Sequence, residues 1–301
     1  MKASRLVAGA FTAAALASAA SRPAAAAQAS TAAPSLTKPA KFLFAAVPKP
    51  DAGSVSAPIG RYWNGCMSGA VHMPGAGPSW QTVRPDANRE WGTPFLLSYL
   101  RRISAKAQAA GVWRGIIIGD MSQPRGGPLP SSHVSHQVGL EADVWFRPMP
   151  DHVMTHAERD TIYSTVMTLP SGLDVDPKTF TQDVVDFIRI SADDPAVDRM
   201  FVNPAIKKAL CRVAKGAPWM TKVRPYWGHR SHYHVRLVCP PGAKSCVPQE
   251  AMPPGDGCDK SLNWWFTPAV LHPKPNPKAK PRPPLTLAGM PAACRAELTK
   301  P

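Results

Sequence analysis

The sequence predicts a single α+β domain with a central antiparallel sheet, flanked by helices and long loops. Strand-like and helix-like segments follow one another in no regular strand-helix-strand order, which indicates α+β. The 35 prolines among 301 residues disfavour a helical bundle or a coiled coil, because proline interrupts helices. We find no internal repeat that would indicate a solenoid. A hydrophobic share of 44% is sufficient for one core.

Helices are predicted where apolar residues recur at helical spacing, over 94–110, 182–191 and 204–215. In the first of them Leu96, Leu100 and Ile103 share one face, and Gly111 ends the helix. Strands are predicted over 112–119, 140–146 and 232–238. The first is a β-branched run typical of a buried strand, and the other two alternate with period two.

The chain divides into four predicted parts. Residues 1–27 combine a charged start at Lys2 and Arg5, an apolar stretch and small-residue cleavage sites, which indicates a cleaved export signal. An uncleaved anchor is the alternative, but the apolar stretch is short for a membrane span. The remaining parts are an Ala/Ser/Thr/Pro-rich linker (28–41), the folded domain (42–266) and a Pro/Lys-rich C-terminal tail (267–301).

The chain is basic, with 35 Lys and Arg against 20 Asp and Glu and a formal charge of +15. An exported basic protein is drawn to anionic polymers such as membrane surfaces, cell-wall material or nucleic acid. Export and the lack of a helix-turn-helix, zinc-finger or RNP pattern disfavour nucleic acid.

Six cysteines in an exported chain indicate a disulfide framework. None of them forms a CxxC pair, which disfavours a cysteine zinc site. Six cysteines allow 15 complete pairings that the sequence does not rank. Only the pair Cys239 and Cys246 is favoured locally, because a turn-rich hexapeptide separates these two residues.

Five of the nine histidines fall in two short clusters, His133 with His136 and His229 with His232 and His234. Alternation along the last strand places His232, His234 and Arg236 on one face. The same parity places Glu141 and Asp143 on one face of the preceding predicted strand, and His136 comes from the loop before it.

Two histidines and one carboxylate with an open fourth position are typical of a catalytic zinc site. The predicted ligands of this mononuclear site are His136, Asp143 and His234. Bound zinc would polarise an amide carbonyl and acidify water, so hydrolysis needs no protein nucleophile. His232 is the predicted base, and His229 the predicted donor to the developing oxyanion or the leaving amine. The alternative is that His232 and His234 are surface strand residues and that His133 and His136 cap a loop. Asp143 would then pair with an arginine.

These motifs resemble a known family. His136-x-x-Gly139-x-x-x-Asp143 with His232-x-His234 is similar to the metallopeptidase group of lysostaphin-type endopeptidases and D-Ala-D-Ala peptidases. More closely, SHQVGLEADVWF, RMFVNPAIKKALC, VRPYWGHRSHYHVRLVCP and PPGDGC resemble the penicillin-insensitive murein endopeptidase family. The likeness covers roughly residues 60–265 and reaches Cys294.

The resemblance implies zinc hydrolysis, in the periplasm, of the D-alanyl-diaminopimelate amide that cross-links peptidoglycan stem peptides. It implies His136, Asp143 and His234 as zinc ligands, His133 as a further metal-site residue, and His229 and His232 as active-site histidines. It also implies three disulfides, which are Cys66–Cys294, Cys211–Cys258 and Cys239–Cys246. The first would tether the tail to the domain.

The sequence departs from the family in one segment. Family members can carry an additional Asp-x-x-His metal pair after the first motif, and residues 169–178 contain Asp174 and Asp176 but no histidine. Two other functions stay open. One is a carboxypeptidase that removes terminal D-alanine from the same stems, and the other is a basic cell-wall binding protein with a structural metal.

Overall fold

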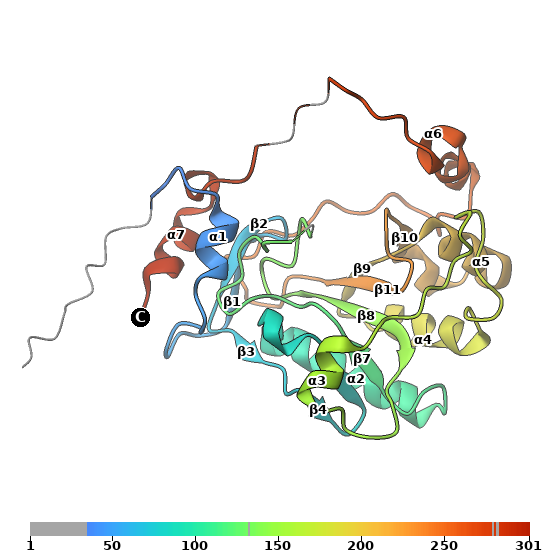
Figure 1. Ribbon diagram of the computed structural model, residues 1–301, viewed down its shortest axis with the longest axis horizontal. Helices are drawn as coiled ribbons and strands as arrows, with labels where there is room; N and C mark the ends of the chain where they lie inside the picture. The colour runs from blue at the N-terminus through green and yellow to red at the C-terminus, as the bar shows by residue number, and fades with distance from the viewer. Residues whose placement is uncertain (1–34, 132, 279, 281–282) are drawn as a thin grey trace, which may run out of the picture. The chain divides into compact units, whose positions relative to one another are not determined.

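A seven-stranded sheet forms the centre of the structure, a computed structural model that describes residues 35–131, 133–278, 280 and 283–301 (Figure 1). The strand order is β10-β9-β11-β8-β7-β5-β4. The strands are β4 (Ala76–Gly77), β5 (Trp80–Thr82), β7 (Ile116–Ile118), β8 (Glu141–Pro148), β9 (Val197–Val202), β10 (Val223–Pro225) and β11 (His232–Leu237). Two small antiparallel pairs accompany the sheet, β1 (Ala57–Arg61) with β2 (Asn64–Ser68) and β3 (Val71–His72) with β6 (Trp91–Gly92).

The predicted signal peptide (1–27) and the first half of the predicted linker (28–34 of 28–41) lie outside the described residues. None of the helices in the described part of the chain is long and apolar enough to cross a membrane.

The sheet is antiparallel at its centre, as predicted, but mixed overall. Strand β11 pairs antiparallel with both β8 and β9, whereas β10 pairs parallel with β9 and β5 parallel with β7. Parallel neighbours need a crossover connection, and helices lie in both connections. These parallel pairs are not evident from the sequence, because β5 and β10 are only three residues long and show no period.

The three predicted helices are confirmed as α2 (Pro94–Ala109), α4 (Gln182–Ala192) and α5 (Pro204–Ala214). Thr93 Oγ1 accepts the Leu96 N–H at 3.3 Å, and Asn203 Oδ1 accepts the Ala205 N–H at 3.0 Å, so α2 and α5 begin with side-chain caps. The shorter helical elements are α1 (Ala40–Ala45), η1 (Pro85–Ala87), α3 (His156–Thr161), η2 (Pro218–Thr221), η3 (Lys260–Phe266), α6 (Pro268–Leu271), η4 (Leu287–Gly289) and α7 (Ala292–Thr299).

The main core lies between α2, α4 and α5 and one face of the sheet. Val144 of β8 and Tyr233 and Val235 of β11 are fully buried there, together with Phe187 of α4. The Tyr233 hydroxyl donates to Ser191 Oγ on α4 at 2.8 Å. Burial of such large side chains contributes roughly 1.5–3 kcal/mol each. Because side chains alternate along a strand, the residues between these core positions project from the opposite face, where the histidine clusters gather.

A second, smaller core joins the two ends of the described chain. Phe44 of α1, Cys66 of β2, Leu287 of η4 and Met290 pack together with Cys294 of α7. The segment that the sequence analysis assigns to a tail therefore has two parts. Residues 272–278 are exposed, whereas 285–301 contain η4 and α7 and pack against the body of the domain.

Three disulfides join Cys66 to Cys294, Cys211 to Cys258 and Cys239 to Cys246, the same pairs as the family resemblance implies. Cys66–Cys294 connects β2 to α7. Cys211–Cys258 connects α5 to the segment before η3, and Cys239–Cys246 closes a short loop after β11.

Arg125 links the C-terminal segment to the loop that carries His133 and His136. Its buried guanidinium donates to the carbonyl oxygens of Glu297 at 2.6 Å and Lys300 at 2.8 Å. The next residue, Gly126, has a φ of +65°, and a Cβ there would lie 2.1 Å from a backbone oxygen of the same loop. Only glycine permits this close approach, so the course of the loop is set by backbone packing.

Candidate active site

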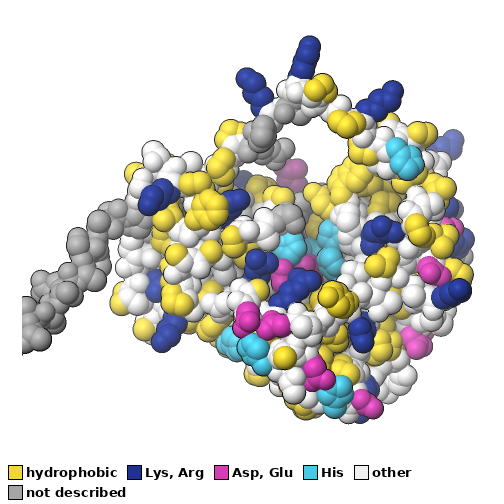
Figure 2. Space-filling view, in the orientation of Figure 1, with side chains coloured by type: hydrophobic (Ala, Val, Ile, Leu, Met, Phe, Trp, Pro, Cys, Tyr) yellow, Lys and Arg dark blue, Asp and Glu magenta, His cyan; other side chains and the backbone are white. Residues whose placement is uncertain are grey.

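The site occupies a cavity of about 590 Å³ on the face of the sheet away from the main core. Figure 2 shows histidine side chains gathered in a hollow of this face. The cavity is lined by all six residues that the sequence analysis assigns to the site, which are His133, His136, Asp143, His229, His232 and His234. The structure therefore brings together residues that are up to 101 positions apart in the chain (133 to 234).

The pairing of β8 with β11 sets the centre of the site. His234 lies directly opposite Asp143 in this antiparallel register, and His232 lies opposite Trp145. A slip by one residue would turn every one of these side chains to the other face of the sheet. The register is held by core residues such as Val144 and Tyr233, so hydrophobic burial on one face positions polar side chains on the other.

Two of the site histidines have left-handed backbone conformations. The φ angle is +66° at His136 and +50° at His229, values that non-glycine residues rarely adopt. At His136 the strain is offset locally, because Glu141 Oε2 accepts its N–H at 2.7 Å and Ser122 Oγ donates to its carbonyl oxygen at 2.6 Å. Such backbone strain is a frequent feature of functional sites.

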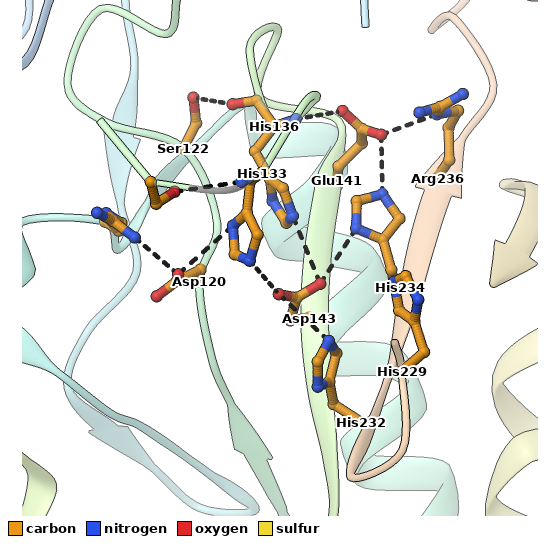
Figure 3. Close-up of polar contacts among 12 residues, drawn as sticks. Asp120, Ser122, His133, His136, Glu141, Asp143, His229, His232, His234 and Arg236 are labelled. Atoms are coloured by element: carbon orange, nitrogen blue, oxygen red, sulfur yellow. Dashed lines mark hydrogen bonds and ion pairs between the residues drawn. The ribbon is translucent and has the colours of Figure 1, made fainter. Parts of the chain in front are cut away.

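Four imidazoles lie around the carboxylate of Asp143 (Figure 3). Its Oδ1 atom lies 3.1 Å from His234 Nδ1 and 3.4 Å from His136 Nε2. Its Oδ2 atom lies 3.6 Å from His133 Nε2 and 3.7 Å from His232 Nε2. The two oxygens thus separate the histidines into two pairs, and the pair at Oδ1 comprises the two histidines predicted as metal ligands.

Glu141 supports the site from outside the predicted ligand set. Its Oε1 atom accepts hydrogen bonds from His234 Nε2 and from Arg236 Nε, each at 2.8 Å. The imidazole of His234 therefore presents Nδ1 to Asp143. Period-two alternation predicts Glu141 on this face but indicates no role for it.

Asp120 is a supporting residue that the sequence analysis missed. Its Oδ2 atom lies 3.5 Å from His133 Nδ1, and Arg89 binds the same oxygen at 2.8 Å. The available signal was an acidic residue directly after the predicted strand 112–119.

The two carboxyl groups of the site are held in the ionised form. Burial alone would raise the pKa of Asp143, but the charges of His136 and His232 and hydrogen bonds from His136 and His234 hold it well below its usual value. Burial opposes ionisation of Glu141 too, and Arg236 with His234 overcomes it and lowers the pKa of this carboxyl.

The pKa values of the imidazoles shift in different directions, depending on the charged groups near each ring. Burial lowers the pKa of His133 to about 4 and that of His229 to about 3, and nearby histidine charges add to the effect. Burial lowers the pKa of His232 as well, partly offset by Asp143. At His234 burial also acts downward, but Asp143 and Glu141 outweigh it and raise the pKa to about 9.

His229 completes the wall of the cavity beside His232. The centroids of the two rings lie 5.1 Å apart, and His229 Nδ1 donates to the carbonyl oxygen of Trp227 at 2.6 Å. This bond leaves Nε2 as the acceptor nitrogen of a neutral His229 ring.

The donor set fits a divalent metal ion. His133, His136 and Asp143 offer ligand atoms within 4.8 Å of one another, and His234 Nδ1 adjoins the same carboxylate. The buried Nδ1 atom of His136 has no hydrogen-bond partner among the described residues. An ionised carboxylate and imidazole nitrogens are ligands of a transition metal such as zinc.

In the segment that departs from the family, Asp174 is bound by Arg212 at 2.8 Å and by Lys208 at 3.7 Å, so cationic side chains occupy this carboxylate.

Known proteins resemble this chain over most of its length. The model of the penicillin-insensitive murein endopeptidase family matches residues 58–299. Proteins named penicillin-insensitive murein endopeptidase from Yersinia enterocolitica, Haemophilus influenzae and Klebsiella pneumoniae are 41%, 39% and 37% identical to this chain. These matches cover 83%, 76% and 84% of this chain and 87%, 82% and 89% of the relatives.

Together with the imidazoles around Asp143, these matches define the class of the protein, which is a metallopeptidase. The chain belongs to the penicillin-insensitive murein endopeptidase family. The resemblance noted from the motifs and the prediction of a metal-dependent peptide hydrolase are thereby confirmed.

Proposed function

We propose that this protein is a zinc-dependent murein endopeptidase that hydrolyses the D-alanyl-diaminopimelate amide between cross-linked peptidoglycan stem peptides. Family membership and the names of the relatives support murein as the substrate. The observation that carries the metal chemistry is the arrangement around Asp143, whose Oδ1 faces His136 and His234. We assign the chemistry to residues 42–266, while 285–301, which pack against the domain and are tethered by Cys66–Cys294, anchor the end of the segment 267–301.

Three side chains would hold the metal, namely His136, Asp143 and His234, with His133 as a further residue of the metal site. When bound, zinc polarises the scissile carbonyl and lowers the pKa of water that attacks it. Glu141 orients His234 through the bond from Nε2, and the bond from the backbone N–H of His136 to Glu141 fixes the position of the second histidine. Such supporting bonds keep the ligands in place.

His232 is the proposed base. It lines the cavity, its Nε2 lies 3.7 Å from Asp143 Oδ2, and its imidazole can take the proton of the attacking water. His229 lies beside it, and we assign it the stabilisation of the developing oxyanion or protonation of the leaving amine. The two histidines proposed as ligands face Oδ1 of Asp143, whereas His232 faces Oδ2.

We propose that the protein acts in the periplasm after cleavage of a signal peptide at residues 1–27. Cleavage removes Lys2, Arg5 and Arg22, and the formal charge of +12 that remains fits an anionic polymer such as peptidoglycan. The charge would then retain the enzyme on its substrate electrostatically, without nucleic acid as a partner and without stable insertion into the membrane. Added salt should release it from isolated murein sacculi.

A comparison of two substrates tests the proposal. Purified enzyme with bound zinc should cleave a cross-linked muropeptide dimer and leave the terminal D-alanine of a free pentapeptide stem in place. Chelation should abolish cleavage, added zinc should restore it, and benzylpenicillin should have no effect, because no serine is acylated. Faster release of terminal D-alanine than dimer cleavage would instead identify a carboxypeptidase. Cleavage that persists after complete metal removal would contradict the metal-dependent mechanism.

A further inference from the structure

A second cavity, of about 370 Å³, adjoins the active-site cavity. The two cavities share Trp227 and Gly228, which lie in the loop between β10 and β11. The second cavity contains none of the metal-site histidines, and no step of the proposed reaction uses it. Its walls come from the segment after α3, from the start of α5 and from α6 with η3.

Three tryptophans form a partly exposed aromatic cluster, and two of them, Trp227 and Trp265, line this cavity. The ring centroids of Trp227 and Trp265 lie 5.0 Å apart, as do those of Trp264 and Trp265. Trp227 is 49% exposed and Trp264 is 54% exposed, although both rings could contribute more to stability if they were buried. Contiguous exposed aromatic surface beside a catalytic cavity is typical of a ligand-binding surface.

Polar groups complete the wall of this cavity. Arg230 is held in place by Nε donating to Thr168 Oγ1 at 2.6 Å and by a second bond to the Leu169 carbonyl oxygen at 3.0 Å. Asn203 donates to the Gly228 carbonyl oxygen at 2.7 Å, and Ser171 is exposed at the rim. The cavity therefore combines indole surfaces with hydroxyl, amide and guanidinium groups.

The aromatic cluster is fixed to the domain rather than carried on a free segment. Cys258, two residues before η3, is joined to Cys211 of α5. The Lys208 ammonium of α5 lies 5.0 Å from the ring centroid of Phe266, the last residue of η3. A binding surface that is already in place loses little entropy when a ligand binds.

We propose that this cavity binds an N-acetylated sugar of the glycan strand, with Trp265 as the main stacking surface. A pyranose ring has an apolar face of C–H bonds and a rim of hydroxyl and amide groups, which matches indole surfaces edged by Ser171, Asn203 and Arg230. The inference rests on the proposed function, because murein carries its stem peptides on a glycan. A few extended residues span on the order of 10 Å, so a stem in the active site brings its sugar to an adjoining cavity.

The loop that lines both cavities also holds a hydrogen bond to an active-site histidine. The Trp227 carbonyl oxygen accepts the bond from Nδ1 of His229. A sugar packed against Trp227 would therefore contact the loop that orients an active-site histidine. Binding of the glycan would position the scissile amide as well as increase affinity.

Two versions of one substrate test the sugar-binding proposal on the zinc-loaded enzyme. The first is a cross-linked muropeptide dimer that carries its disaccharides, and the second is the same dimer with the sugars removed by an amidase. The ratio of kcat/KM for the first to that for the second should fall about tenfold in Trp265→Ala. Trp265→Tyr should recover part of the ratio. The control Tyr163→Ala, an aromatic residue that is 82% exposed and lines neither cavity, should keep the wild-type ratio.

A second variant tests the same cavity in case Trp265→Ala does not fold. Ser171→Trp places a large side chain at the exposed rim and should lower the ratio similarly by filling the cavity. A ratio that stays within twofold of wild type in the folded variants would overturn the proposal. Titration with triacetylchitotriose, followed by tryptophan fluorescence, separates this proposal from the proposed function. Binding that is lost in Trp265→Ala, in an enzyme that cleaves neither dimer, would support the sugar site and refute the endopeptidase.

Discussion

Glu141 and His234 are joined by a buried hydrogen bond of 2.8 Å between Oε1 and Nε2, across the pairing of β8 with β11. The same carboxylate accepts the backbone N–H of His136 through its other oxygen. One side chain outside the proposed ligand set therefore orients one proposed ligand by its ring and another by its backbone.

Glu141→Gln should weaken metal binding by about 10- to 100-fold, because an amide oxygen accepts the His234 bond less strongly and the amide nitrogen cannot accept one. Competition with a chromogenic chelator measures the affinity, and circular dichroism checks the fold. Glu158→Gln, at an exposed capping position of α3, is the matched control and should bind metal as the wild type does. Unchanged metal affinity in Glu141→Gln would show that the carboxylate has no part in the metal site.

His232→Ala and His234→Ala should both lose activity, but for different reasons. Loss of the proposed base should leave a folded, metal-loaded protein whose kcat is at least about 100-fold lower. Loss of the proposed ligand should instead remove the metal. Metal content by atomic spectroscopy, measured beside activity on the dimer, distinguishes them, and His152→Ala, at an exposed histidine outside the cavity, serves as control. Metal loss in His232→Ala would assign that residue to the metal site.

The disulfides should differ in their effect on stability. Cys66–Cys294 spans 228 residues and Cys239–Cys246 spans 7. Loop-closure entropy in the unfolded chain predicts losses of about 5 and about 2.5 kcal/mol when each pair is replaced by serine. Urea unfolding of the two double variants measures the difference. An equal or larger loss for the short loop would mean that native packing, rather than chain entropy, determines the effect.

Lys207 predicts a pH dependence of stability that is independent of the active site. Its ammonium donates to the backbone oxygens of Met220 and Asp256, and burial, aided by the charge of Arg224, lowers its pKa to about 7 from 10.5. Between these pH values the unfolded chain binds more protons than the folded one, so this residue makes stability rise with pH.

Lys207→Met should remove that rise. The free energy of unfolding, measured by urea at pH 7, 8.5 and 10, should increase less steeply with pH in the variant than in the wild type. Lys244→Met, at an exposed position, is the control and should keep the wild-type slope. Parallel curves for wild type and Lys207→Met would contradict the lowered pKa.

Much of the fold follows from local patterns. The helical period of Leu96, Leu100 and Ile103 placed α2, and the alternation around Asp143 and His234 placed the two central strands. The short strands β5 and β10 carry too few residues to show a period, so the parallel pairs at both sides of the sheet were not predicted. The packing of 285–301 is not evident from the sequence because this segment follows the Pro/Lys-rich residues 272–284, and its packing partners in α1 and β2 lie more than 200 positions away in the chain.

The sequence by itself determined which side chains share a face, because the period of a strand is a local property. It thereby placed His232 and His234 on one face of their strand, and Glu141 and Asp143 on one face of theirs. Only the tertiary structure decided how these pairs meet, since the register of β8 against β11 and the left-handed turn at His136 depend on packing between distant segments. The roles of Glu141 and Asp120, and the cavity that Trp227 shares with Trp265, arise for the same physical reason. Contacts between residues far apart in the chain form only when the whole core packs.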